Sequence, residues 1–433
     1  MSMALARRLP FYYGWVVVGV VFVLMAVGVN ARTAFSLLFP PILDEFGWDR
    51  ALTAGAFSFG FLVSAVLSPL LGRLMDSHGP RLVCGLGIAA TAGGMIGVTL
   101  ATQPWQFYLT LGVLVGAGSV CLGYTCQALF LPSWFARRRG LAMSIAFSGV
   151  GVGSIVMLPL LQWLIERSGW RAACLAVGVF TLLALAPLVL LLRRRPEDLG
   201  LLADGDAAPA AGAAARRAAN VVDAAWTAID WTLARAVRTA RFWWIGAGYF
   251  CGLFSWYLVQ VHQTRYLIEV GFSPHQAAWA LGAVSLAGVP GQILLGQLSD
   301  RIGREPVWAI GNLGFVFTCL ALLALPSWPS PAMLWFMVLV QGALGYGLTS
   351  VYGAIPAEVF EGRHYGSIVG VLMLGAIVGG AAGPWVGGLM YDTTGSYAGA
   401  LWVAIVASLL SIGAIYAAAP GKVRAVAGRI GRA

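Results

Sequence analysis

The sequence predicts an all-α polytopic membrane protein in which twelve transmembrane helices form two pseudo-symmetric six-helix bundles. Three observations lead to this fold class. First, 59% of the 433 residues are hydrophobic and only 10% are charged, whereas soluble domains carry roughly 25% charged residues. Second, the apolar residues gather in twelve segments, and a helix of roughly 20 such residues crosses a bilayer core. Third, the two halves of the chain share landmarks at a constant offset.

The apolar segments are expected to be helices, because backbone groups in lipid must find hydrogen-bond partners within the protein. In chain order they lie near residues 12–42, 51–72, 81–102, 106–131, 141–165, 171–192, 242–268, 275–298, 306–325, 332–356, 366–390 and 397–419. This order predicts a first six-helix bundle over residues 1–192, a linker over 193–240 and a second six-helix bundle over 241–433.

The arginines predict the orientation of these helices. Of the 27 basic residues, 22 lie on one side of the membrane if the N-terminus is cytoplasmic. Because cytoplasmic loops are enriched in Arg and Lys, we expect both termini in the cytoplasm and the chain in the cell (inner) membrane. The net charge of +10 could suggest nucleic acid, but these basic residues lie in short loops between apolar segments. We therefore expect the lipid bilayer, and no nucleic acid, as a partner.

The linker at residues 193–240 differs from the rest of the chain in composition. Three arginines and a proline end the sixth segment, and a stretch rich in Ala, Gly, Pro and Asp follows, which is typical of a flexible connection. Within the linker, apolar residues recur at helical spacing at Val222, Trp226, Ile229, Leu233 and Val237. This pattern predicts an amphipathic helix on the cytoplasmic interface, with packing under the helical bundle as the alternative.

The two halves of the chain match at one constant offset over most of their length. The matched pairs are Gly72 with Gly296, Asp76 with Asp300, Gly79 with Gly303, Gly118 with Gly342, Gly123 with Gly347, and Pro132 with Pro356. A slightly longer offset then matches Gly149 with Gly375, Gly153 with Gly379, and Gly169 with Gly395. Two homologous halves that both begin in the cytoplasm are parallel repeats, and transporters built in this way hold their substrate near the membrane midplane.

A loop motif, GxLxDxxGxR, follows the second segment at residues 72–81, and a nine-residue copy of it, GxLxDxxGR, follows the eighth at residues 296–304. Glycine there permits a close helix approach, the carboxylate can cap a helix or pair across the bundle, and arginine can bind carbonyls or a carboxylate. An ordinary charged turn is the alternative. We expect four residues of this motif to gate the cytoplasmic side, namely Asp76, Arg81, Asp300 and Arg304.

Further short motifs accompany the loop motif. They are Tyr13-Gly14-Trp15, Arg32 followed by Phe35 and Phe39-Pro40-Pro41, Glu45-Phe46-Gly47-Trp48, His262 with Tyr266 before Gly271, the glycine-rich Gly383-Pro384-Trp385-Val386-Gly387-Gly388, and Asp392-Thr393-Thr394-Gly395-Ser396-Tyr397. With them, the chain resembles the major facilitator superfamily over all twelve segments. More narrowly, it resembles the bacterial monocarboxylate porters and the related oxalate/formate exchangers. The resemblance implies the major facilitator fold and transport of a small organic anion by alternating access.

The eighth segment departs from the pattern of the monocarboxylate porters. In that family an arginine usually stands four residues before the glycine of the loop motif, often with an acidic residue one turn earlier. The corresponding residues here are Gln292 and Gly288. The anion-binding arginine and the proton-accepting carboxylate that the resemblance would imply are therefore both replaced.

Arg32 interrupts the first apolar segment eleven residues before Leu43, roughly 16 Å below the outer end of a straight helix at 1.5 Å per residue. A charge at that depth costs about 2.5 kcal/mol or more. All 17 acidic residues are expected at segment ends or in loops, and none at the depth of Arg32. We therefore expect Arg32 to pair with the carboxylate of an anionic substrate; snorkelling outward, or bonding to backbone carbonyls, is the alternative.

Other polar residues within the segments are weaker candidates. Arg265 could pair with Glu269 at i,i+4 spacing, and His262 could relay a proton or simply form hydrogen bonds. Candidates for the substrate path, each of which could instead be an ordinary interhelical contact, are Asn30, Tyr124, Gln127, Tyr257, Gln260, Gln292 and Tyr346. A glycine-rich face formed by Gly375, Gly379 and Gly383 predicts tight helix packing.

The sequence contains no phosphate loop, catalytic triad or metal-ligand cluster, and its six cysteines fall inside apolar segments. We therefore expect neither an enzyme nor a cofactor. The expected function is secondary active transport of a small organic anion by a monomer, with proton symport favoured by the resemblance alone. Exchange of two anions is the alternative; a drug/proton antiporter or a non-transporting membrane scaffold fits less well, the antiporter because no acidic residue is expected within the membrane.

Overall fold

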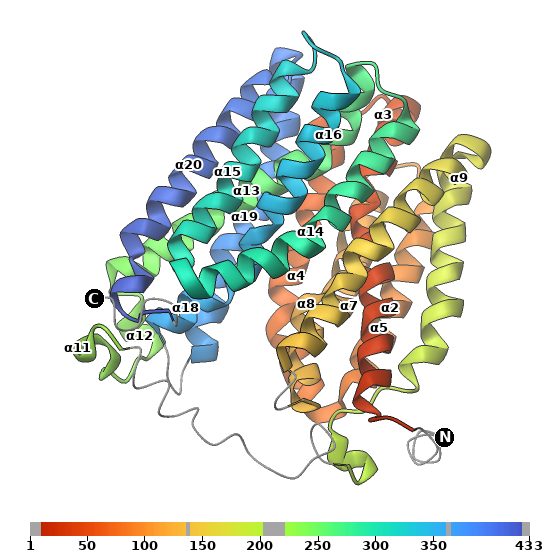
Figure 1. The fold of residues 1–433 in the computed structure, drawn as a ribbon. Helices are drawn as coiled ribbons and strands as arrows, with labels where there is room; N and C mark the ends of the chain where they lie inside the picture. Colours follow the sequence, from red (N-terminus) through yellow and green to blue (C-terminus); the bar gives the residue numbers. More distant parts are fainter. Residues whose placement is uncertain (1–9, 136–138, 202–220, 361–364, 427–433) are drawn as a thin grey trace. The chain divides into compact units, whose positions relative to one another are not determined.

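The computed structural model describes residues 10–135, 139–201, 221–360 and 365–426, and Figure 1 shows the course of the chain. By their contacts the residues fall into two compact units. The first unit comprises Met1–Trp48 and Leu52–Ala211, and the second comprises Asp49–Ala51 and Gly212–Ala433.

The first unit contains the first six spans. The first span is α2 (Gly14–Thr33), which continues beyond Ala34 as α3 (Phe35–Phe46), and the next two are α4 (Arg50–His78) and α5 (Pro80–Gly97) with η1 (Val98–Leu100). The fourth span joins α6 (Pro104–Phe107), the π-helical η2 (Tyr108–Val115), α7 (Gly116–Leu122), α8 (Tyr124–Phe130) and η3 (Leu131–Ser133). The fifth and sixth spans form the long helix α9 (Arg139–Val189), kinked at Gly169, and η4 (Pro196–Leu199) follows.

The second unit contains the other six spans. They begin with α13 (Ala240–Glu269), α14 (Pro274–Ile302) and α15 (Arg304–Ala324). The tenth span joins α16 (Pro331–Leu339), the π-helical η6 (Val340–Leu344), η7 (Gly345–Gly347), α17 (Leu348–Tyr352) and α18 (Ala354–Val359). The last two are α19 (Tyr365–Thr394) and α20 (Ala398–Ala418), which is followed by η8 (Pro420–Lys422).

The fold class predicted from the sequence is confirmed. In the described part of the chain, eleven helices are long and apolar enough to cross a membrane, and one of them, Ile145–Val189, is divided into two spans by the kink at Gly169. The internal repeat is visible in the helices, because the offset that relates Gly79 to Gly303 also relates both ends of α4 to those of α14. Gly79 and Gly303, at the matching loops, both have positive φ angles of 77° and 103°, a conformation that favours glycine.

Equivalent glycines pack the equivalent helices of the two units together. In the first unit, a Cβ atom at Gly153 of α9 would lie 2.4 Å from the carbonyl oxygen of Ala26 on α2. In the second, a Cβ at Gly379 of α19 would lie 2.1 Å from the carbonyl oxygen of Phe250 on α13. Gly375 and Gly383 also approach this helix closely, since a Cβ there would lie 2.7 Å from the carbonyl oxygen of Gly246 and 2.3 Å from that of Phe254. The predicted packing face on the eleventh span is therefore confirmed.

The linker differs from the single amphipathic helix that its apolar periodicity predicts. Two one-turn helices, α11 (Ala224–Thr227) and α12 (Leu233–Ala236), lie beside α18 at the end of the second unit (Figure 1). Separate N-caps at Asp223 and Thr232 start them, which interrupts a continuous helix. The Trp226 indole donates to the Val359 carbonyl at 2.8 Å, and Trp231 is buried 5.2 Å from the Phe360 ring. The single helix is therefore wrong for this segment, and packing against the bundle is observed.

Candidate functional site

Arg32 lies in the last turn of α2, two residues before the junction with α3. Its guanidinium carbon is 3.6 Å from the centre of the Phe61 ring and 5.1 Å from that of Phe57. Its Nη1 donates a long hydrogen bond of 3.5 Å to the Ser119 hydroxyl. A cation over an aromatic face gains about 0.5–2 kcal/mol. Two phenylalanines and one serine therefore help to set the position of this charge within the first unit.

A small pocket opens beside the guanidinium of Arg32. Apolar side chains from three spans form its walls, namely Phe35, Leu38, Phe57, Leu111 and Val115. Leu111 and Val115 belong to the π-helical stretch η2, and π-helical turns occur frequently at functional sites. Among the described residues that line the pocket, Arg32 is the one charged group. The arrangement is an apolar cavity with one cation at its edge.

The close approach of two glycines forms part of the pocket lining. A Cβ at Gly116 would lie 2.8 Å from the Cα of Gly60, so the two helices touch backbone to backbone. Ser64 donates its hydroxyl to the Gly60 carbonyl at 2.7 Å and lies 3.3 Å from that of Gly116. Ser119 donates to the same Gly116 carbonyl at 2.8 Å. The carbonyl groups of this part of the lining are therefore already hydrogen-bonded.

Three other residues predicted for the substrate path also lie in the first unit. Asn30 is buried and joins α2 to α9, because its amide nitrogen donates to the Val150 carbonyl at 3.0 Å and its amide oxygen accepts from Ser154 at 2.6 Å. Gln127 is buried and donates to the Leu122 carbonyl at 3.2 Å. Tyr124 packs edge-on against Phe147. The described lining of the pocket includes Arg32 but none of these three.

In the second unit, Tyr346 is the centre of a packed aromatic group. Its ring lies 4.5 Å from that of Trp256, and its hydroxyl is 3.2 Å from the Ser285 hydroxyl. A Cβ at Gly288 would lie 2.6 Å from the Tyr346 ring. The position where the resembled family often has an acidic residue is therefore covered by this ring. Gln292 and Tyr257 are both partly buried on helices of the same unit.

His262 is buried in the second unit and held through both ring nitrogens. Its Nε2 lies 2.8 Å from the Pro384 carbonyl oxygen and its Nδ1 lies 3.0 Å from the Tyr397 hydroxyl. A carbonyl only accepts, so in neutral His262 the hydrogen is on Nε2 and Nδ1 accepts from Tyr397. Arg50, the first residue of α4, belongs by its contacts to the second unit and donates to the Tyr397 oxygen at 2.7 Å.

Arg265 forms the ion pair that its spacing predicts. Its Nε lies 3.1 Å from Oε1 of Glu269, four residues further along α13. Arg50 pairs with the same carboxylate. The prediction of an i,i+4 pair is confirmed.

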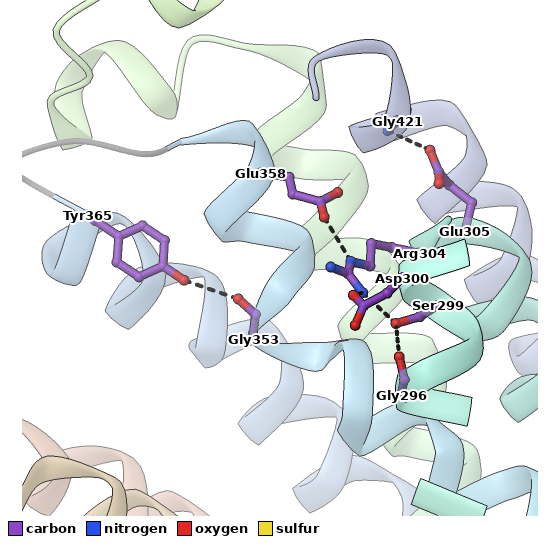
Figure 2. A network of polar contacts seen from close by, with 9 residues as sticks. All are labelled: Gly296, Ser299, Asp300, Arg304, Glu305, Gly353, Glu358, Tyr365 and Gly421. Carbon is purple, nitrogen blue, oxygen red and sulfur yellow. Dashed lines mark hydrogen bonds and ion pairs between the residues drawn. The ribbon is translucent and has the colours of Figure 1, made fainter. Parts of the chain in front are cut away.

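Figure 2 shows the polar network at the second loop motif. Arg304 donates from Nε to the Glu358 carboxylate at 2.7 Å and from Nη1 to Asp300 at 2.8 Å. The same Nη1 also donates to the Ser299 hydroxyl. Two of the four predicted gating residues, Asp300 and Arg304, are thus in direct contact with each other. Glu358 brings the end of the tenth span into the same network.

The two loop motifs hold the last helix of their own unit in different ways. Arg81 donates to the carbonyls of Leu192, at 2.8 Å, and Leu190, just after the sixth span. The residue at the matching position, Glu305, accepts from the Gly421 amide at 2.7 Å, just after α20 (Figure 2). An arginine in the first unit and a glutamate at the matching position in the second therefore both bind the backbone that follows the last helix of their unit. The side chain of Asp76, the fourth predicted gating residue, lies outside the described residues.

The sequence interpretation missed the residues that surround Arg32. Phe57 and Phe61 are four residues apart and so lie on one face of α4, a signal that was available. The sequence gives no sign of the roles of Ser119 and of the Gly60–Gly116 pair, since these roles depend on which helices become neighbours.

Comparisons with known proteins agree with the fold. The model of the Major Facilitator Superfamily matches residues 18–270 and 245–430. Monocarboxylate transporter 13 of Rattus norvegicus is 29% identical over 90% of this chain and 86% of its own length. Monocarboxylate transporter 11 of Mus musculus is 28% identical, covering 90% and 84% of the two chains. A solved bacterial homolog of the human lysosomal transporter Spinster, inward-facing and occupied, has a TM-score of 0.66 and 15% identity, covering 93% and 96%.

Proposed function

The chain belongs to the major facilitator superfamily and is a transporter related to the monocarboxylate transporters, and on this basis we propose that it carries a small organic anion, a monocarboxylate, across the membrane by alternating access. It is a multi-pass membrane protein whose partners are lipid and a small-molecule substrate. In the proposed arrangement the chain acts as a monomer in the cell (inner) membrane. Both termini and both loop motifs are cytoplasmic, in keeping with the distribution of arginines.

The observation that supports a carboxylate most directly is the guanidinium of Arg32 at the edge of an apolar pocket. An arginine offers a fork of donors that matches the two oxygens of a carboxylate. Ligand pockets are mostly apolar and contain a few polar groups that orient the ligand. In this proposal Arg32 binds the carboxylate of the substrate and the pocket receives the adjoining carbon atoms.

Proton symport is our first proposal for the coupling, because the resemblance of the sequence motifs to the monocarboxylate porters favours it. The proton would travel on the substrate's own carboxyl group or through His262. Exchange of two anions is the second candidate, and a specific observation favours it: the eighth span has Gly288 and Gln292 where the resembled family has ionisable side chains, and Tyr346 covers Gly288. Exchange requires no proton-accepting group.

Reconstituted vesicles provide the test. Purified protein is incorporated into liposomes, and uptake of labelled isovalerate, benzoate and lactate is measured with and without an acidic exterior. Saturable uptake of at least one of these acids is expected. Stimulation by external acid supports symport, whereas counterflow without a pH gradient, and no response to one, supports exchange. Vesicles that show no saturable uptake of any carboxylate would contradict transport of monocarboxylates and favour a non-transporting scaffold.

A further inference from the structure

We propose that the pocket beside Arg32 selects monocarboxylates that bear a hydrocarbon group next to the carboxyl carbon, and disfavours 2-hydroxy acids, 2-keto acids and dicarboxylates. The inference rests on the proposed function and adds the chemical class of the substrate. Four features of the first unit support it: one cation, aromatic walls, a serine committed to other bonds, and a lining whose carbonyls are already bonded.

The charge of the pocket suits one carboxylate. Arg32 is the one charged residue among the described residues that line it. Its guanidinium is positioned by the faces of Phe61 and Phe57, at 3.6 and 5.1 Å. A second carboxylate on the same ligand would enter apolar surroundings, where an ion without a partner is strongly disfavoured. The pocket therefore favours a monoanion over a dianion.

The walls suit hydrocarbon. The Phe35 and Phe57 rings both line the pocket and are 5.3 Å apart, so they form one aromatic wall, and Phe61, which is not among the lining residues, packs 5.5 Å from Phe57. Leu38 and Val115 extend the same apolar lining. Apolar groups leave water favourably for such a surface. An alkyl or aryl substituent beside the carboxylate would contact these side chains directly.

Hydrogen-bonding groups near the pocket are already in use. Ser119 donates its proton to the Gly116 carbonyl and accepts from Arg32, so its hydroxyl has no proton left for a ligand. Ser64 bonds to the carbonyls of Gly60 and Gly116. A hydroxyl group on the substrate would therefore lose its water without gaining an acceptor in this lining. A 2-hydroxy acid should bind roughly tenfold or more weakly than its unsubstituted parent acid.

Two ligands that differ by one hydroxyl group test the inference. Isovalerate and each enantiomer of 2-hydroxyisovalerate are compared as competitors of labelled isovalerate uptake into vesicles that contain the full chain. Isovalerate should compete at least about tenfold more strongly than either hydroxy acid. In the variant Val115→Thr, the new hydroxyl can donate to the helix carbonyl four residues earlier and still accept from a ligand. This variant should reduce the ratio at least threefold.

Val113→Thr is the matched control. It makes the same chemical change in the same π-helical stretch, and Val113 is not among the residues that line the pocket. Its ratio should equal that of the wild type. Equal competition by isovalerate and the hydroxy acids would overturn the selectivity and leave the proposed function intact. A Val115→Thr ratio no different from that of Val113→Thr would overturn the role of this pocket. The absence of competition by any carboxylate would overturn the proposed function as well.

Discussion

Arg32 and Trp256 occupy matching positions in the two halves of a duplicated fold, at the same offset as the two loop motifs, and their surroundings differ sharply. In the first unit the guanidinium of Arg32 lies over Phe61 at the edge of a small pocket. In the second unit Trp256 is buried and packs against Tyr346, and Ser285, at the position that matches Phe61, bonds to the same tyrosine. One half has a charged residue beside a small pocket where the other has packed aromatic side chains.

The contrast shows which parts of the duplication have been kept. Contacts between backbones are shared, as between Gly153 and Ala26 in one unit and Gly379 and Phe250 in the other. Helix bounds are shared as well, since the residue numbers of α4 and α14 differ by this same offset at both ends. The side chains within this framework have diverged. We infer that the first unit recognises the charge of the substrate, while the matching region of the second unit contributes packing.

Substitutions at Arg32 and at Trp256 should differ strongly in their effect on substrate affinity. Arg32→Gln should lower the apparent affinity for a transported carboxylate by at least about 30-fold, because removing one partner of a buried charge pair costs about 2 kcal/mol or more. Trp256→Phe keeps an aromatic ring and should change affinity by less than about threefold. Concentration-dependent uptake into vesicles measures both. Comparable losses of affinity in the two variants would show that the two units do not differ in substrate recognition.

A smaller effect, on thermal stability, tests whether the side chains around Tyr346 are packed too tightly to accept an added methyl group. Gly288→Ala places a Cβ 2.6 Å from the Tyr346 ring, and overpacking of this kind costs about 1–3 kcal/mol. The melting temperature of the purified protein should fall by several degrees. Gly296→Ala, on the same helix, meets Ser350 at an ordinary 3.5 Å and should cause no loss. Equal melting temperatures for the two variants would show that Tyr346 moves aside without cost.

The smallest effect concerns the ends of the helices. Glu305→Ala removes the acceptor of the Gly421 amide, so that amide should exchange its hydrogen with solvent about tenfold or more faster, consistent with the loss of about 1.5–3 kcal/mol for a bond to a charged group. Hydrogen–deuterium exchange of the peptide that contains Gly421 measures this. Glu305→Gln retains an acceptor and should lie between the variant and the wild type. Unchanged exchange in Glu305→Ala would mean that other contacts hold the segment.

Sequence reasoning reached the fold because hydropathy and repeated glycines are local signals. It also identified the Arg265–Glu269 pair, whose spacing alone brings the two side chains together. The linker helix was predicted wrongly, because two N-caps and tertiary contacts of Trp226 and Trp231 outweigh apolar periodicity. The partner of Asn30 could not be predicted either, since it depends on the packing of α9 against α2.

The pocket, too, could be predicted only where a signal lies within one segment of the sequence. Arg32 could be recognised in the sequence as a charge in an apolar segment. Its walls come from three spans that are distant in the chain, and their neighbourhood is decided by helix packing. Periodicity within a single helix contains no information on such contacts. The predicted roles of Tyr257, Gln292 and Tyr346 remain predictions for the same reason.

A ligand and a variant changed together test whether Arg32 recognises the charge of the substrate. Binding of isovalerate and of its uncharged amide, isovaleramide, is measured by calorimetry on the purified wild type and on Arg32→Gln, after the melting temperature shows that the variant is folded. The wild type should prefer the carboxylate at least about 30-fold, and the variant should bind both ligands within about threefold. A folded Arg32→Gln protein that keeps the wild-type preference would contradict recognition of this charge by Arg32.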